Sequence, residues 1–171
     1  MSANPPAPLT TPAPPADGAG LAFPAEAYAQ MVAAAYAAYP LEACGLLVGR
    51  DRDVHRFVPC TNEAASAKVY AIPGRELLRA ERAAEDDGLA IIGVFHSHTH
   101  SEPYPSPTDL AQAADPTWHY VIVSLKRESP EARCYLLPDP HAPDSHAPAP
   151  AAGDGRPVGS TGIREVPITV T

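Results

Sequence analysis

The chain has 171 residues, of which 45% are hydrophobic and 19% charged, and its formal net charge is -8. This length fits one domain with its own hydrophobic core. The negative charge gives nucleic-acid binding no electrostatic support, and no apolar run approaches the roughly 20 residues that span a bilayer. The N-terminus lacks the basic start and apolar stretch of a signal peptide. We therefore expect a cytoplasmic protein that binds neither nucleic acid nor membrane.

Proline clusters near both ends of the chain. Six of the 22 prolines lie within residues 1–20, and six more within 138–157. Both stretches hold few large apolar side chains, which predicts a disordered or polyproline-like N-terminal extension and a Pro-rich linker or loop at 138–160. The folded domain is expected over residues 21–137. A final strand within 161–171 could close its sheet.

The elements expected in the folded part alternate between helical and strand periodicity. The first is a helix over residues 24–38, with one apolar stripe formed by Tyr28, Val32, Ala35 and Tyr39. The others, in chain order, are strands at 45–50, 55–60 and 68–73, a helix at 74–87, a strand at 89–98, a helix at 107–114, and strands at 118–125 and 132–137. This order predicts an α/β (α+β) domain with a mixed, largely antiparallel sheet flanked by helices.

A candidate metal site lies in the segment FHSHTHSEPYPSPTDL, residues 95–110. Side chains at positions i and i+2 of a strand point to the same face, so His96 and His98 project together and can share a zinc ion. Catalytic zinc normally takes three protein ligands and leaves a fourth position for water. Asp109, at the expected start of the next helix, can supply the third ligand. We expect one zinc ion per chain.

Two further residues complete a hydrolytic site. Glu42 lies immediately before a strand, which would hold it rigidly as a general base for attack on an amide. Ser106 could donate a hydrogen bond to the developing oxyanion, a role whose removal typically costs about 100- to 1,000-fold in rate.

Each piece also has a simpler interpretation. Histidines at a strand end are often exposed polar residues, and a Glu beside a strand is usually solvated. Ser106, Pro107 and Asp109 form a good helix N-terminus, with Ser as the cap, Pro at the first helical position and a carboxylate in the first turn. That interpretation needs no metal.

Taken together, the five residues match a specific pattern: a Glu, a long gap, HSH, seven residues, Ser, two residues and Asp. The arrangement resembles the JAMM motif of MPN+ zinc metallopeptidases. The resemblance implies a single MPN/JAMM domain of cytidine deaminase-like fold. It also implies that Glu42 is the base, that His96, His98 and Asp109 bind zinc, and that Ser106 assists the oxyanion.

The segments EACGLLVG, TNEA and HSHTHSEPYPSPTDLAQAADPTWHYVIVS extend the resemblance over about residues 24–137. They are similar to the bacterial Mec-like branch, whose members act on CysO-type sulfur carriers, small ubiquitin-like proteins that end in Gly-Gly. The implied partner is such a carrier. The implied reaction is hydrolysis of the amide between its C-terminus and cysteine, which releases cysteine for biosynthesis.

Several alternatives stay open. A similar peptidase could trim residues that mask the C-terminus of a sulfur carrier or of another ubiquitin-like protein, and a phage-type relative could cut peptidoglycan peptides. MPN domains without ligands serve as scaffolds, but here the motif is complete. A His-rich metal-storage protein would need no Glu42. The sequence does not indicate an oligomeric state.

The remaining histidines and the cysteines are assigned minor roles. We expect the chain to leave the strand at Thr99, so that His100 lies outside the ligand set, in the cleft or in solvent. His119 is expected in the core and His55 on a strand surface. His141 and His146 fall in the Pro-rich linker, which could fold over the cleft and bring one of them toward the metal. The three cysteines, Cys44, Cys60 and Cys134, are expected to be inert thiols rather than a disulfide framework or a zinc site.

Overall fold

The computed structural model describes residues 20–139 and 162–171. In chain order its elements are β1 (Leu21–Phe23), α1 (Ala25–Ala38), β2 (Cys44–Arg50), β3 (Asp53–Cys60), α2 (Gly74–Asp86), β4 (Ala90–His98), α3 (Pro107–Ala111), β5 (His119–Ser124), β6 (Glu131–Leu136), β7 (Arg164–Val166) and β8 (Ile168–Val170). Nearly all of the expected N-terminal extension and of the Pro-rich linker, with His141 and His146, lies outside the described residues. Among the described helices, none combines the length and the apolar character that crossing a membrane requires.

The strands form one mixed sheet in the order β7-β6-β5-β4-β2-β3-β1-β8. The central strand β4 pairs antiparallel with β2 and parallel with β5. Strands β2 and β3 form an antiparallel hairpin, and β6 pairs antiparallel with both β5 and β7. Most of the strand pairs are therefore antiparallel, which confirms the predicted α/β domain with a mixed, largely antiparallel sheet.

The C-terminal segment supplies the edge strand at each side of the sheet, β7 at one edge and β8 at the other. β7 pairs with β6 and β8 pairs with β1, although only Pro167 separates the two strands in the chain. The Pro167 carbonyl accepts a hydrogen bond from the Leu21 amide at 2.8 Å. A Cβ atom at Gly20 would lie 2.2 Å from the same oxygen, so this close approach requires glycine. The segment considered for a closing strand at 161–171 pairs with the sheet as two short strands, because Pro167 between them has no amide hydrogen for a continuous ladder.

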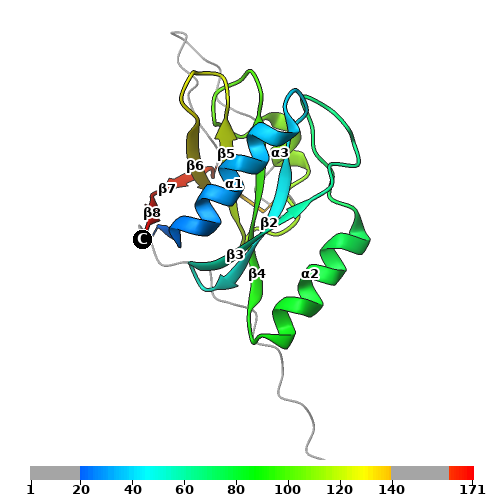
Figure 1. The fold of residues 1–171 in the computed structure, drawn as a ribbon, viewed down its shortest axis with the longest axis vertical. Coiled ribbons are helices and arrows are strands. Elements are labelled where there is room, and N and C mark those ends of the chain that lie inside the picture. Colours follow the sequence, from blue (N-terminus) through cyan, green and yellow to red (C-terminus); the bar gives the residue numbers. More distant parts are fainter. Residues whose placement is uncertain (1–19, 140–161) are drawn as a thin grey trace, which may run out of the picture.

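Two hydrophobic clusters cover opposite faces of the sheet. On one face, Met31 of α1 packs in a cluster with Leu47 and Phe95. On the other face, Ala80 of α2 belongs to a second cluster, with Val94 of β4 among its members. Consecutive residues of one strand enter different clusters because side chains alternate across a sheet. Figure 1 shows α1 lying across the sheet and α2 at the lower right, beside β4.

The expected apolar stripe of the first helix was wrong in part. The buried residues of α1 are Ala27, Met31 and Ala35, and Tyr39 is 52% exposed. The helix ends at Ala38, so Tyr39 cannot continue a helical stripe. Ala27, Met31 and Ala35 are spaced four residues apart and therefore share one side of the helix.

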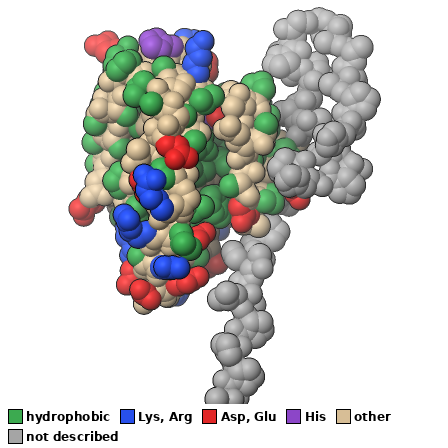
Figure 2. All heavy atoms as spheres, turned by 90° about the vertical axis from the view of Figure 1, so that its right-hand side faces the viewer, with side chains coloured by type: hydrophobic (Ala, Val, Ile, Leu, Met, Phe, Trp, Pro, Cys, Tyr) green, Lys and Arg blue, Asp and Glu red, His purple; other side chains and the backbone are tan. Residues whose placement is uncertain are grey.

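Two other expected elements differ in the structure. Residues 68–73 form no strand, because the Val69 carbonyl and the Ala71 amide bond to the side chain of Asn62 rather than to a neighbouring strand. The helix expected at 107–114 ends at Ala111, where the Gln112 amide bonds back to Thr108 and Leu110. Figure 2 views the side of the molecule that carries α2, where acidic and basic side chains are interspersed and hydrophobic ones show in a hollow beside them.

Candidate metal centre

The two candidate histidines lie at the end of β4 and are almost fully buried. His96 and His98 are 1% and 4% exposed. They are two residues apart on a strand that extends to His98, so both project from the same face as Val94. Their Nε2 atoms are 3.1 Å apart. The structure therefore brings these two side chains together as their spacing predicts.

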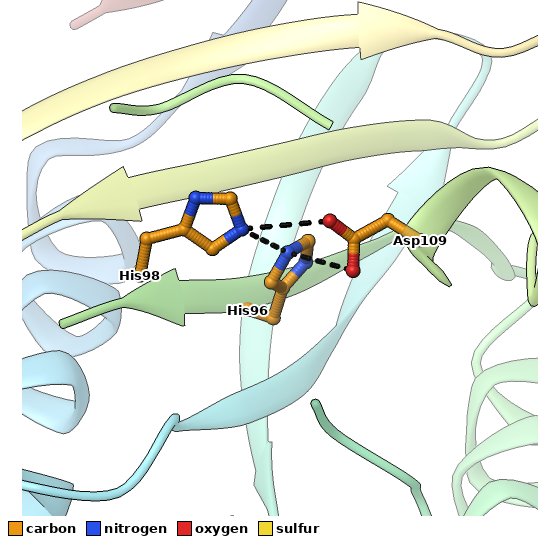
Figure 3. A group of neighbouring side chains, drawn as sticks. All are labelled: His96, His98 and Asp109. Carbon is orange, nitrogen blue, oxygen red and sulfur yellow. Dashed lines mark hydrogen bonds and ion pairs between the residues drawn. The ribbon is translucent and has the colours of Figure 1, made fainter. Parts of the chain in front are cut away.

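Asp109 reaches the histidines from the first turn of α3. Its Oδ1 lies 3.4 Å from His96 Nε2, and its Oδ2 lies 3.5 Å from His98 Nε2. One ligand atom from each of the three residues lies within 4.8 Å of the others. Figure 3 shows the carboxylate and the two imidazole rings converging on one point between β4 and α3.

Ser106 holds this carboxylate in place through a capping box. The Ser106 hydroxyl oxygen accepts a hydrogen bond from the Asp109 amide at 3.1 Å, and the Ser106 amide donates to Asp109 Oδ2 at 2.7 Å. Pro107 occupies the first helical position. The structure confirms that Ser106 caps this helix. The same two contacts orient Asp109 toward the histidines.

The two histidines are oriented by different neighbours. His98 Nδ1 donates to the Glu102 carbonyl at 2.7 Å, so Nε2 is the ring nitrogen that faces Asp109 and is available to a metal ion. His96 Nδ1 has no hydrogen-bond partner among the described residues. Its ring instead stacks on Tyr70, with the centroids 4.5 Å apart and the planes 18° from parallel.

The donor set fits a zinc ion. Two imidazole nitrogens and one carboxylate oxygen are ligands that catalytic zinc takes, and they leave a fourth position for water. Without a metal ion, the two buried imidazoles and the carboxylate have few hydrogen-bond partners, and burying such polar groups costs free energy. Glu42 Oε2 is also buried without a hydrogen-bond partner among the described residues. A cation and its water would give these atoms partners.

Glu42 lies just before β2 and is 4% exposed. Burial raises the pKa of its carboxyl to about 7, against the lowering effect of His98, and Asp109 adds to the rise. A general base works best when its pKa lies near the operating pH. The solvated carboxylate of the simpler interpretation is therefore wrong for Glu42.

The charges of the three candidate ligands depend on one another. Burial alone would raise the pKa of Asp109, but its contacts with His96 and His98 hold that pKa well below the usual range. Burial lowers the pKa of His96 despite Asp109. Burial would also lower the pKa of His98, but Asp109 and the Glu102 carbonyl raise it above the ordinary value. These directions favour the ionised form of Asp109 and the neutral form of His96, the forms that bind a metal, whereas at His98 a cation must compete with a proton.

The other histidines lie away from this group. His100 is exposed, with its ring nitrogens near Thr99 and Tyr39, and it is not part of the converging set. His119 is 1% exposed, and its Nδ1 lies 3.2 Å from the Ile92 carbonyl. His55 is exposed on β3. These placements confirm the expectations for His119 and His55.

The three cysteines are free thiols. Burial is the main cause of the raised pKa of each, to about 12 for Cys44 and about 11 for Cys60. Cys134 is fully buried and its pKa is raised further. A thiol with a raised pKa is a poor nucleophile, in line with the expectation of inert side chains.

Sequence reasoning missed three residues that support the site. Ser97 lies between the two histidines, and its hydroxyl accepts a hydrogen bond from the Ala43 amide at 2.8 Å, next to Glu42. Tyr70 stacks on His96, and the Asn62 side chain bonds to the Glu42 carbonyl. Ser97 and Asn62 lie in segments that carry the resemblance, HSH and TNEA, whereas Tyr70 lies outside those segments.

An apolar cavity adjoins the metal centre. It has a volume of about 270 Å³, and its lining includes Leu46, Ile72, Val94 and Trp118. Tyr70 lines the cavity and also stacks on His96, so one side chain separates the cavity from a candidate ligand.

Comparison with known proteins identifies the family. Residues 24–137 match the family described as prokaryotic homologues of the JAB domain. The CysO-cysteine peptidase of Mycobacterium tuberculosis is 41% identical over 113 residues, which cover 64% of this chain and 77% of that protein. The desampylase of Haloferax volcanii is 38% identical over 88 residues, which cover 50% of this chain and 63% of that protein.

A solved structure shares the fold. A protein from Desulfitobacterium hafniense, solved in solution, aligns with a TM-score of 0.67 and 28% identity, over 88% of this chain and 92% of that one. The match over most of the described domain, with relatives that are peptidases, shows that this chain belongs to the JAB/MPN family of peptidases, in its prokaryotic branch.

Proposed function

We propose that this enzyme is a zinc-dependent peptidase that hydrolyses the amide between the C-terminal Gly-Gly of a ubiquitin-like sulfur carrier and cysteine. The observation that carries the proposal is the convergence of His96, His98 and Asp109 beside Glu42, whose buried Oε2 lacks a partner among the described residues. This arrangement has a place for a metal and a base beside it. The relative named CysO-cysteine peptidase supports the substrate.

In this proposal His96, His98 and Asp109 hold the zinc. Bound zinc supplies a Lewis acid, which lowers the pKa of water and polarises a carbonyl. Ser106 and the Glu102 carbonyl fix the orientation of Asp109 and His98. Because these partners are already in place, the ligands need little rearrangement to bind the ion.

Glu42 acts as the general base. It accepts a proton from the attacking water and delivers it to the amine of the leaving cysteine, so its carboxylate is regenerated in each cycle. Burial raises the pKa of Glu42 above the ordinary carboxyl value, which makes it a stronger base, and a bound cation would act in the opposite direction. The Ser106 hydroxyl accepts a bond from the Asp109 amide, so its own hydrogen is free to donate to the oxyanion.

The burial of the site supports a slender substrate tail. Glu42, His96, His98 and Asp109 are each 5% exposed or less. A tail that reaches them must pass between packed side chains, and a Gly-Gly tail has no side chains to obstruct it. The same narrowness disfavours a branched peptidoglycan peptide.

A second candidate is the trimming of longer tails from ubiquitin-like proteins. The similarity to the desampylase of Haloferax volcanii favours it, because this relative is not named for a cysteine adduct. Both candidates use the same residues and differ only in the group attached to the carboxyl end of the Gly-Gly. A scaffold role is disfavoured, since all five motif residues are present. We place the reaction in the cytoplasm, where the three free thiols would stay reduced.

Mass spectrometry of carrier tails tests the proposal. A sulfur carrier ending in Gly-Gly-Cys, one with a longer tail after Gly-Gly, and one ending in Gly-Ala-Cys would be incubated with the zinc-loaded enzyme. We expect cysteine release from the first carrier only, no product with Glu42→Gln, and none after zinc is removed. Cleavage of the longer tail alone would favour trimming. Equal cleavage of the Gly-Ala-Cys tail would overturn the narrow-channel argument.

A further inference from the structure

Residues 61–73, the loop between β3 and α2, wrap around the side chain of Asn62. Asn62 Nδ2 donates to the Glu42 carbonyl at 3.0 Å and to the Val69 carbonyl at 3.1 Å. Asn62 Oδ1 accepts from the Ala64 and Ala71 amides, both at 3.1 Å. An amide side chain has two donor hydrogens and two acceptor lone pairs, so this half-buried residue uses its full capacity.

One end of this network holds Glu42. Besides the bond from Asn62 to its carbonyl, the Glu42 amide donates to the Ser66 carbonyl at 2.9 Å. Glu42 precedes the first paired residue of β2, Cys44, so the sheet ladder does not hold it. Both backbone polar groups of Glu42 are therefore bonded to this loop.

The other end of the network holds Tyr70. The Asn62 side chain bonds to the residues on either side of it, the Val69 carbonyl and the Ala71 amide. Tyr70 in turn stacks on His96, whose Nδ1 has no hydrogen-bond partner among the described residues. The His98 ring is held by the Glu102 carbonyl, whereas the His96 ring depends on the stack and on Asp109.

We propose that Asn62 is a positioning residue that fixes the base and one metal ligand in a single geometry. It sets Glu42 through the backbone carbonyl and His96 through Tyr70, and it touches neither substrate nor metal. This inference rests on the proposed function, because it uses the roles assigned there to Glu42 and His96. A displacement of about 1 Å in a catalytic group can cost about 100-fold in rate.

The test compares Asn62→Asp and Asn62→Ala with a matched control, Asp115→Ala. Asn62→Asp keeps the acceptor for Ala64 and Ala71 but sets a carboxylate oxygen against the Glu42 and Val69 carbonyls, whereas Asn62→Ala removes all four bonds without adding a charge. Asp115 is also half-buried, and its side chain closes a turn by accepting from the Thr117 amide and hydroxyl, without a contact to Glu42 or His96. Zinc affinity would be measured against a chromophoric chelator, and ligand geometry from the visible spectrum of the cobalt-substituted protein.

We expect both Asn62 variants to bind zinc about 10- to 100-fold more weakly and to show a shifted cobalt spectrum. On the Gly-Gly-Cys carrier, kcat should fall about 100-fold with little change in KM. Asp115→Ala should lower thermal stability alone. A folded Asn62→Asp protein with wild-type zinc affinity, spectrum and kcat would overturn the inference.

Two further variants keep the inference testable if the Asn62 variants do not fold. Tyr70→Leu keeps apolar volume but removes the stack on His96, and Tyr70→Phe keeps the ring. Weaker zinc binding in Tyr70→Leu that Tyr70→Phe restores would support the inference, whereas wild-type affinity in Tyr70→Leu would overturn it. A wild-type enzyme that binds zinc but cleaves no carrier would count against the proposed function alone, because zinc affinity and the cobalt spectrum still report on Asn62.

Discussion

The two faces of the central strands carry different kinds of side chain, although the same strands supply both. On the face covered by α1, Phe95 and Val121 pack into a cluster that also holds Met31. On the opposite face Val94 and Tyr120 belong to a second cluster, but β4 ends in His96 and His98. Burying polar groups costs stability unless they find partners. The face covered by α1 therefore stabilises the domain. The end of the opposite face buries the polar side chains of the candidate metal centre, which costs stability.

A buried histidine on each face sharpens the contrast. His96 meets a carboxylate, an aromatic ring and a second imidazole. His119 starts β5 and is equally buried, but within the described part of the chain its side chain bonds to the Ile92 carbonyl alone. Burial alone therefore does not make a metal site. What distinguishes His96 is the convergence of other donors on its Nε2 atom.

The largest effect is expected from removing two ligands together. His96→Ala combined with His98→Ala should abolish zinc binding and turnover, with a loss well over 100-fold, since changing even the partners of metal ligands typically costs about 10- to 100-fold. Metal analysis of the purified protein measures this directly. His55→Ala, on the exposed surface of β3, is the control. Undiminished zinc binding in the double variant would show that the metal lies elsewhere.

Glu42→Gln should separate metal binding from catalysis. The amide has almost the same shape but cannot accept a proton, so kcat should fall about 100- to 10,000-fold while the zinc content stays at one per chain. Carrier cleavage and metal analysis on the same sample check both halves. An active variant would remove Glu42 from the role of base.

Met31→Ala tests the opposite face. Met31 is fully buried in the cluster on the α1 side, and truncating such a residue lowers the free energy of unfolding by about 2–5 kcal/mol. Zinc affinity and kcat of the folded protein should not change. Chemical denaturation measures the first quantity, and Leu78→Ala, at a 47% exposed position of α2, is the control. A loss of zinc affinity in Met31→Ala would contradict the division between the two faces.

Ser106 caps α3 and is proposed to stabilise the oxyanion, and two substitutions can separate these roles. Ser106→Ala should lower the free energy of unfolding by about 1 kcal/mol, and Ser106→Gly by only a few tenths, because glycine is a tolerable N-cap. If the hydroxyl stabilises the oxyanion, both should lose about 100- to 1,000-fold in kcat. Denaturation and kinetics on the two variants decide this. If kcat falls only in Ser106→Ala, the less stable variant, and is nearly normal in Ser106→Gly, capping is the only role of Ser106.

The smallest effect is expected at His119, as a pH dependence of stability. Burial lowers the pKa of His119 below its ordinary value of 6.5, so the unfolded chain takes up the proton first as the pH falls. The contribution is fully present above about pH 6.5 and is lost below it, with a slope of at most about 1.4 kcal/mol per pH unit. His119→Asn should flatten this part of the stability curve relative to the wild type. Parallel wild-type and His119→Asn curves would refute the assignment.

Much of the site could be predicted from the sequence because its parts are local. The spacing of His96 and His98 and the Ser106 capping box depend on strand and helix geometry alone, and resemblance to a known motif supplied Glu42. The errors lie where distant contacts decide. The segment at 68–73 has the composition of a strand, but Asn62 takes its hydrogen bonds. Strand β1 has three residues and exists through pairing with β3 and β8.

By itself, the sequence determined most of the strands and helices of the domain and the residue types that can hold a metal ion. Periodicity and capping act between near neighbours, so they can be read from the chain. Only the tertiary structure decided that Glu42 is buried enough to raise its pKa to about 7, that Tyr70 stacks on His96, and that Asn62 links the two. These features depend on contacts between segments far apart in the chain, which local patterns do not specify.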